Sequence, residues 1–342
     1  MKKLLYLGLL CALAVTAGAQ VAPAPLQPLG AALENLDYPI TPKFIELEVE
    51  NQRVRMFYMD AASGTVGGLA PFSPRPMTLP VVLLLHGKNF GGNYWEGPMR
   101  ALVTAGYRVI VPDQIGFGKS SKPEIGYSFD LLADNTARLL DELKIARVSV
   151  VGHSMGGMLA AKFALKYPNR VNKLVLENPI GFEDYSKVIP AQSLETVYRN
   201  ELADTDPAKI RAFYGRYFVT WKPEYEKLAE IKARQALGGE WPRVAKAAAL
   251  TYQMIVEQPV VGQFPQIQVP TLLIIGQEDR TVVGKNYASP DATKNLGNYP
   301  ELGKSAARAI RGAKLAEFEN IGHIPHLEAP EKFNSTLLEF LK

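Results

Sequence analysis

A serine between two glycines is the first group in this chain that could do chemistry. It lies in the stretch Gly152-His153-Ser154-Met155-Gly156, between an apolar run with strand character and a run of helical period. A sharp turn from strand to helix would lift the Ser154 hydroxyl above a sheet, and glycines relieve the crowding of such a turn. The backbone N–H of Met155 would face the same space, which makes it a candidate donor to an oxyanion.

A serine hydroxyl is a weak nucleophile at neutral pH and needs a base. The chain has four histidines. His323 and His326 of the stretch IGHIPHLEAP both follow the end of an apolar run, so spacing alone leaves both as candidate bases. His153 would point away from Ser154 across the tight turn, and we expect it to have a packing role.

The fourth histidine, His86, opens the segment HGKNFGG directly after the apolar run PVVLLL. We expect a structural role for His86, since the useful groups at this place are backbone N–H donors that glycines leave accessible. The N–H of Lys88, or failing that the N–H of Asn89, would complete an oxyanion hole with that of Met155. The Lys88 ammonium group could favour an acidic substrate, or it could be a solvated surface cation.

A base of this kind is oriented by a carboxylate. Asp279 in LLIIGQEDRTV follows a strongly apolar run and is the favoured acid. Asp113 also follows a strand-like run, but it lies in a glycine-rich turn where aspartate commonly bonds nearby backbone. The remaining competitors, all less favourably placed, are Glu278, Glu183 and Asp184.

The elements that must position these groups alternate along the chain. Residues 44–60 form two alternating runs around Asn51-Gln52, which predicts an antiparallel hairpin. Further strand-like runs cover 80–86, 107–112, 147–153, 173–178, 270–276 and 314–320, most of them separated by helical stretches. This order predicts an α/β fold with a mostly parallel eight-stranded sheet, helices on both faces, and ligands at the carboxyl ends of the strands.

One interval interrupts the alternation. Residues 181–265 contain helical, aromatic-rich stretches without a convincing strand, and we interpret them as an inserted helical cap between core segments 44–180 and 266–342. Its aromatic residues more often pack a cap onto a core than line an acyl pocket. Residues 282–303, long for a loop after the acid, are expected at the pocket entrance.

The first 19 residues have two lysines, an apolar run and small residues ending at Ala19, which predicts a signal peptide, export to the periplasm or beyond, and no stable membrane anchor. The only cysteine, Cys11, lies in this leader, so the mature protein would have no disulfide and no cysteine-ligated metal. The Pro- and Ala-rich residues 20–43 are expected to be a linker with little regular structure. Of the formal net charge of +4 among 342 residues, Lys2 and Lys3 contribute two, which leaves no electrostatic basis for nucleic-acid binding.

Residues 44–342 resemble the α/β-hydrolase superfamily. HGKNFGG is similar to its oxyanion loop, DQIGFGKS to its D-x-x-G-x-G-x-S loop, GHSMGG to its nucleophile elbow, GQEDRTV to its acid loop and GHIPHLEAP to its histidine loop. The resemblance implies Ser154 as nucleophile, Asp279 as acid and His323 as base, with no cofactor or metal. His326 falls on a variable position, where it would support the site from behind or line the entrance.

A serine in the elbow implies acyl chemistry, whereas dehalogenases and most epoxide hydrolases of this superfamily have Asp there. The elbow also departs from the G-G-S-W-G form of proline iminopeptidases. Carbon–carbon bond hydrolases share the cap but usually have Gly and Pro after the oxyanion HG and Trp after the catalytic His; this chain has Lys88-Asn89 and Ile324. A cofactor-free haloperoxidase would use the same triad, and a binding protein would commonly lack a triad residue. We expect an exported serine hydrolase acting on a small or medium carboxylic ester, of unknown oligomeric state.

Overall fold

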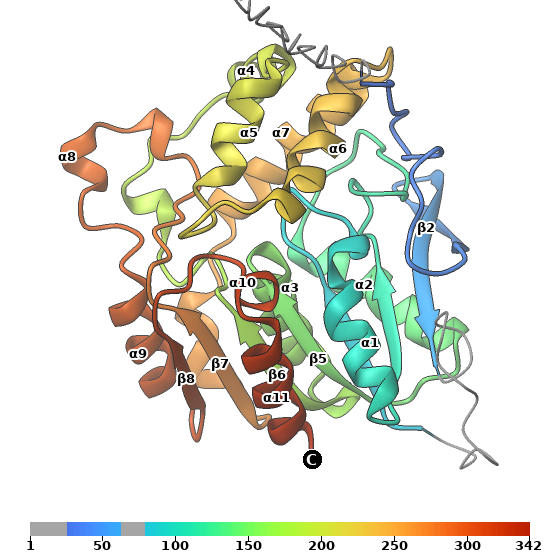
Figure 1. The fold of residues 1–342 in the computed structure, drawn as a ribbon, viewed down its shortest axis with the longest axis vertical. Coiled ribbons are helices and arrows are strands. Elements are labelled where there is room, and N and C mark those ends of the chain that lie inside the picture. The colour runs from blue at the N-terminus through green and yellow to red at the C-terminus, as the bar shows by residue number, and fades with distance from the viewer. Residues whose placement is uncertain (1–25, 63–78) are drawn as a thin grey trace, which may run out of the picture.

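The structure is a computed structural model that describes residues 26–62 and 79–342 (Figure 1). The predicted leader 1–19 lies outside the described residues. Every strand that we expect from the sequence is present, with ends within a residue or two of the prediction. The strands are β1 (Lys43–Val49), β2 (Gln52–Ala61), β3 (Val81–Leu85), β4 (Arg108–Pro112), β5 (Val148–His153), β6 (Val171–Glu177), β7 (Thr271–Gly276) and β8 (Lys314–Phe318).

The strands form one eight-stranded sheet in the order β1-β2-β4-β3-β5-β6-β7-β8. Strand β2 pairs antiparallel with both β1 and β4, and the other pairs are parallel. At the hairpin turn, Glu50 and Asn51 have φ values of 47° and 61°, the left-handed conformation that tight hairpin turns require. The predicted α/β fold with a mostly parallel sheet is confirmed.

Helices cover both faces of the sheet (Figure 1). The apolar faces of α1 and α11 belong to one buried cluster, and those of α2, α3 and α9 belong to the cluster on the opposite face. These helices are α1 (Glu96–Thr104), α2 (Phe129–Glu142), α3 (Met155–Lys166), α9 (Tyr299–Ala309) and α11 (Pro330–Leu341). Within the described parts of the chain, none of the helices has the length and apolar character needed to cross a lipid bilayer.

Four helices lie between β6 and β7 and form a layer over one end of the sheet (Figure 1). Ser193 caps the first of them by accepting a hydrogen bond from the N–H of Thr196, and Asp206 caps the second in the same way, directly before Pro207. The four are α4 (Leu194–Ala203), α5 (Pro207–Gly215), α6 (Glu226–Ala236) and α7 (Trp241–Glu257). They lie within the interval 181–265 that we interpret as a cap.

The described part of the predicted linker, from residue 26 onward, has no helix or strand before β1, but it is packed against the rest of the molecule. Leu29 and Leu33 are buried, at 1% and 3% exposure. The Leu29 N–H donates to the carbonyl oxygen of Arg234 in α6, and the Lys119 ammonium group donates to the carbonyl oxygen of Leu33. The expectation of little regular structure is confirmed for these residues, but they do not form a free linker, because two leucines are buried and the backbone is hydrogen-bonded to α6 and to Lys119.

Candidate active site

The turn from β5 to α3 holds Ser154 in a strained conformation. Ser154 has φ 56° and ψ −122°, a region that residues with a side chain rarely occupy. A Cβ added at Gly152 would overlap with the carbonyl oxygen of Gly156, and one added at Gly156 would overlap with the carbonyl oxygen of Leu85 in β3. Both glycines of the G-x-S-x-G pattern are thus required by the close approach of backbones.

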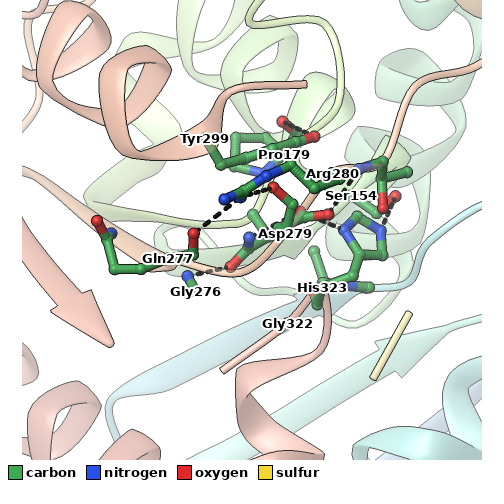
Figure 2. A network of polar contacts seen from close by, with 12 residues as sticks. Ser154, Pro179, Gly276, Gln277, Asp279, Arg280, Tyr299, Gly322 and His323 are labelled. Atoms are coloured by element: carbon green, nitrogen blue, oxygen red, sulfur yellow. Dashed lines mark hydrogen bonds and ion pairs between the residues drawn. The ribbon is translucent and has the colours of Figure 1, made fainter. Parts of the chain in front are cut away.

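Ser154 is joined to His323 and Asp279 in one chain of hydrogen bonds (Figure 2). The Nε2 atom of His323 lies 3.0 Å from Ser154 Oγ, and its Nδ1 atom lies 2.7 Å from Asp279 Oδ2. A carboxylate can only accept, so Nδ1 carries the proton and Nε2 is free to accept the proton of the serine hydroxyl. All three residues are buried, with at most 6% exposure. The structure brings together the three residues that the sequence predicts for the triad.

Asp279 is held as a carboxylate by its neighbours. Its Oδ1 atom accepts the N–H of Thr281 at 2.8 Å, and its Oδ2 atom accepts the side-chain amide of Asn178 at 2.8 Å. Burial alone would raise the pKa of Asp279, but His323 and these hydrogen bonds outweigh burial and keep that pKa below its usual range. Asn178 also accepts the N–H of Gly276 and so ties the end of β6 to that of β7. Asn178 is not among the site residues predicted from the sequence, where its only signal is its place at the end of a strand-like run.

The backbone N–H groups expected for the oxyanion hole lie at the start of a helix and in the loop that approaches the nucleophile. Met155 is the first residue of α3, where a helix leaves its N–H without an intrahelical acceptor. The loop after β3 passes close to the nucleophile, since a Cβ added at Gly87 would lie 3.1 Å from Ser154 Cβ. Within residues 26–62 and 79–342, the N–H groups of Lys88 and Asn89 donate no backbone hydrogen bond. Lys88 and Asn89 therefore both stay open as the second donor.

His86 and His153 have the structural roles that we expect from their positions. His86 Nε2 accepts the N–H of Gln114 at 3.0 Å, which ties β3 to the loop after β4. His153 Nε2 lies 2.8 Å from the carbonyl oxygen of His323 and donates to it. Its Nδ1 atom accepts the hydroxyl of Tyr94 at 2.9 Å. His153 thus fixes the backbone of the base and does not contact the serine hydroxyl.

His326 is not at the pocket entrance, which corrects one of the two expectations for it. Its side chain is fully buried, and its Nδ1 atom lies 2.9 Å from both carboxylate oxygens of Glu177. The backbone N–H of His326 also donates to Glu177, and its ring stacks on Trp95 with centroids 4.2 Å apart. Glu177 in turn accepts the N–H of Ser154 through its carbonyl oxygen. His326 therefore supports the site indirectly, through the end of β6, the strand that pairs with β5 and accepts the N–H of Ser154.

A cap residue completes the surroundings of the base. The backbone N–H of His323 donates to the carbonyl oxygen of Tyr217 at 2.7 Å, and the two rings lie 4.9 Å apart. The Tyr217 hydroxyl accepts the side-chain amide of Asn89 at 2.7 Å. Tyr217 thus links the histidine loop to the oxyanion loop. In the sequence, Tyr217 is one of several aromatic residues in the cap interval, and nothing there indicates this role.

The competing acidic residues have other partners. Asp113 accepts the backbone N–H groups of Gly92 and Lys119, as expected for an aspartate in a turn. Glu183 accepts the N–H of Gly297. Glu278 is close to Arg280 at the surface. In the described part of the chain, none of these three carboxylates is hydrogen-bonded to a histidine.

Segment 282–303 is more structured than a loop. It contains a 3-10 turn (Lys285–Tyr287), the short helix α8 (Pro290–Thr293) and the first residues of α9. Its Tyr287 hydroxyl accepts the side-chain amide of Asn200 in α4 at 2.9 Å. No residue of the segment lines the cavity beside the oxyanion loop. Tyr287 also contacts the ring of Tyr252 in α7, so the segment packs against two cap helices, and its place at the pocket entrance stays a prediction.

The Lys88 side chain is an ion-pair partner and not a solvated surface cation. Its Nζ atom lies 3.3 Å from Glu201 Oε1, with 13% of the Lys88 side chain exposed. Lys232 Nζ lies 3.7 Å from the other oxygen of Glu201. These cations lower the pKa of Glu201, although burial acts in the opposite direction. No group of three or more His, Cys, Asp or Glu side chains in the described residues could hold a metal ion.

Comparisons with known proteins agree with this geometry. A family model described as alpha/beta hydrolase fold matches residues 80–330. A 2-hydroxy-6-oxononadienedioate/2-hydroxy-6-oxononatrienedioate hydrolase of Paraburkholderia xenovorans is 30% identical over 312 residues, 88% of this chain and 95% of the relative. A putative non-heme chloroperoxidase of Synechocystis and lipase 1 of Psychrobacter immobilis are each 29% identical, over 76% and 72% of this chain and 91% and 72% of their own length. The crystal structure of a probable hydrolytic enzyme from Pseudomonas aeruginosa is 43% identical, with a TM-score of 0.86 over 93% of this chain and 99% of that chain.

Proposed function

The chain belongs to the α/β-hydrolase family, and from that premise we propose that it is a serine hydrolase that cleaves small or medium carboxylic esters. The observation that supports this most is the unbroken hydrogen-bond chain from Ser154 through His323 to Asp279. A serine with an oriented base and accessible backbone donors has the parts that acyl transfer needs. The lipase among the relatives is consistent with an ester as substrate.

The proposed reaction has two halves. In the first, Ser154 Oγ attacks the ester carbonyl carbon while His323 Nε2 takes the hydroxyl proton, and the N–H of Met155 binds the oxyanion together with that of Lys88, or of Asn89 in its place. The tetrahedral intermediate then collapses, the carbon–oxygen bond to the alcohol breaks, and His323 returns the proton to the leaving alcohol. In the second half, water attacks the acyl-enzyme, His323 accepts its proton, and the acid leaves as the proton returns to Ser154.

Asp279 keeps this cycle oriented. Its lowered pKa means that it is ionised at neutral pH, so it accepts the Nδ1 proton of His323 throughout. It also stabilises the imidazolium that forms when His323 holds two protons. The hydrogen bonds from Thr281 and Asn178 fix the direction of the carboxylate.

Cleavage of a carbon–carbon bond is the second candidate, because the Paraburkholderia relative is named for that kind of substrate. The residues after the oxyanion HG and after the base differ from the pattern usual in such hydrolases. Here these positions hold Lys88-Asn89 and the fully buried Ile324. The proposal of an ester substrate rests on this difference. Haloperoxidase activity is a further candidate, since it would use the same three residues.

Export remains a prediction from residues 1–19.

The test is hydrolysis of p-nitrophenyl esters of graded chain length by purified wild-type, Ser154→Ala and Ser335→Ala proteins, with a dienone acid and a lactone in the panel. We expect ester hydrolysis by wild type, a loss of roughly 10⁶-fold in kcat for Ser154→Ala, and no loss for Ser335→Ala, which alters an exposed serine on α11. A fluorophosphonate probe should label only the two proteins that retain Ser154. Unchanged ester hydrolysis by Ser154→Ala would contradict the mechanism, and cleavage of the dienone acid alone would replace the ester by the second candidate.

A further inference from the structure

The two residues that compete for the second oxyanion donor are held by the cap. Lys88 Nζ forms its ion pair with Glu201 of α4 at 3.3 Å. The carbonyl oxygen of Asn89 accepts the hydroxyl of Tyr214 in α5 at 2.9 Å, and the side-chain amide of Asn89 donates to the hydroxyl of Tyr217 at 2.7 Å. Within the described part of the chain, these are the only hydrogen bonds and ion pairs of Lys88 and Asn89.

Contacts with the core hold the residues on either side of this pair. The N–H of Gly87 donates to the hydroxyl of Tyr94 at 2.9 Å, and the ring of Phe90 stacks on that of Tyr94 with centroids 4.7 Å apart. The N–H of Phe90 donates to the carbonyl oxygen of Gly87 at 3.2 Å, which closes a tight turn over residues 87–90. We call residues 87–90 the oxyanion turn. The core thus fixes its two ends, and the cap holds its two central residues.

Tyr217 contacts the base as well as the oxyanion turn. Its carbonyl oxygen accepts the N–H of His323 at 2.7 Å, and the two rings lie 4.9 Å apart. Two residues on, the N–H of Val219 donates to Glu328 Oε2, while Glu328 Oε1 accepts the N–H of Gly322. The cap segment that carries Tyr217 is therefore tied to the histidine loop directly before and at the base.

Position decides whether a backbone N–H can stabilise an oxyanion. The donor must lie about 2.7–3.1 Å from the place where the negative charge develops. A displacement of about 1 Å can cost roughly 100-fold in rate. Because the central residues of the oxyanion turn have their polar contacts on the cap, the position of their N–H groups depends on the cap.

We propose that Tyr214 and Tyr217 are positioning residues, whose hydroxyl groups hold Asn89 so that the oxyanion turn keeps its donor against Ser154. The cap then completes the catalytic site in addition to covering it. This inference rests on the proposed function, since it concerns how the oxyanion of the same reaction is bound.

The experiment compares Tyr214→Phe, Tyr217→Phe and the double variant of the full chain with wild type. Each change removes one hydroxyl and keeps the ring. Tyr167→Phe is the matched control, because the Tyr167 hydroxyl donates to Asp134 at 2.6 Å, at the opposite end of α3 from Ser154. The kcat values refer to the concentration of sites that a fluorophosphonate labels at completion, so that unfolded protein does not count.

We expect kcat for p-nitrophenyl esters to fall roughly tenfold in each single variant and roughly 100-fold in the double variant. KM should stay within about twofold, because the oxyanion donor binds the transition state more strongly than the ester. Tyr167→Phe should change neither value.

The pH dependence of kcat/KM separates an effect on the oxyanion turn from an effect on the base. In Tyr217→Phe, Asp279 and the backbone carbonyl oxygen of residue 217 still hold His323. The midpoint of the acid limb should therefore be the same as in wild type.

The rate of fluorophosphonate labelling is a readout that needs no ester. Ser154 Oγ forms a bond to phosphorus as fluoride leaves, its proton passes to His323, and the phosphoryl oxygen occupies the oxyanion hole. We expect labelling to slow in both tyrosine variants and to keep its wild-type rate in Tyr167→Phe.

The outcomes separate this inference from the proposed function. If the double variant keeps the wild-type kcat and labelling rate, the inference is wrong and the ester hydrolase stands. A loss of kcat with a shifted acid limb also overturns it, because the tyrosines would then act on His323. Slower labelling of the variants of a protein that hydrolyses no ester would support the inference and refute the ester substrate. If wild type is neither labelled nor active on esters, both proposals fail. Should the double variant not fold, the two single variants decide.

Discussion

His323 and His326 are three residues apart, yet their side chains have different surroundings. His323 has a carboxylate on one ring nitrogen and the Ser154 hydroxyl on the other. His326 has Glu177 on one nitrogen, no partner in the described residues on the other, and the Trp95 ring stacked on one face. A base must exchange protons with a reacting group, and only His323 contacts one.

The two histidines should therefore respond differently to substitution by alanine. His323→Ala should lower kcat for ester hydrolysis by roughly 10⁴- to 10⁶-fold with little loss of stability. His326→Ala should lower the free energy of unfolding by about 1–3 kcal/mol, because it leaves the buried Glu177 carboxylate without its side-chain partner. Ester kinetics together with urea unfolding of both variants measure these effects.

Two outcomes would contradict this assignment of the base. A His326→Ala protein that is as stable as wild type but inactive would make His326 the base and His323 the supporting residue. A His323→Ala protein that retains normal turnover would have the same meaning.

At the scale of elements, the crossing of β5, α3 and β3 sets the position of the nucleophile. The backbone of Gly156 lies against the carbonyl oxygens of Leu85 and His86, so nothing larger than hydrogen fits. This contact holds the start of α3 close to the oxyanion loop. The Met155 N–H can then point to the same space as the Ser154 hydroxyl.

Gly156→Ala should therefore separate α3 from β3 and harm both stability and catalysis. We expect at least about 1–3 kcal/mol of destabilisation, as for overpacking in a core, and a loss of kcat of about 100-fold or more because the oxyanion donor moves. The matched control is Gly97→Ala in α1, where an added Cβ meets no atom within 4 Å. Since alanine favours a helix over glycine, Gly97→Ala should leave kcat unchanged and stability equal or slightly higher. Thermal unfolding and ester kinetics compare the pair, and similar behaviour of the two variants would refute the close-contact argument.

At the scale of the whole molecule, the segment before β1 joins the cap to the core. It bonds to α6 through Leu29, accepts a hydrogen bond from the core residue Lys119, and places Leu33 in the wall of the cavity. Tyr38 in the same segment donates to Asp113 at 2.8 Å. Residues far apart in the sequence thus close one side of the cavity beside the oxyanion loop.

Leu29→Ala should weaken this connection. Because Leu29 is 1% exposed, its truncation should lower the free energy of unfolding by about 2–5 kcal/mol, whereas Leu26→Ala should change it by less than about 0.5 kcal/mol, since Leu26 is 38% exposed. Urea unfolding of the two variants measures the difference. Equal stabilities would mean that the segment does not contribute to the folded core.

The sequence by itself determined the sheet, the nucleophile and the triad. Strand periodicity is a local signal, so the eight strands could be predicted to within a residue or two. The G-x-S-x-G pattern is local as well, and the resemblance to a known family identified Asp279 and His323 on their loops. These groups follow strands, and the carboxyl ends of parallel strands meet at one edge of a sheet.

Only the tertiary structure decided how the remaining residues serve that triad. His326 and Glu177 are 149 positions apart, and Asn178 and Asp279 are 101 apart. The burial of Leu29 and the hydrogen bond between Tyr217 and Asn89 of the oxyanion loop also depend on segments that meet only after folding. A pairing across such separations leaves no periodic pattern in either segment, because each partner is selected by the space and charge that the other provides.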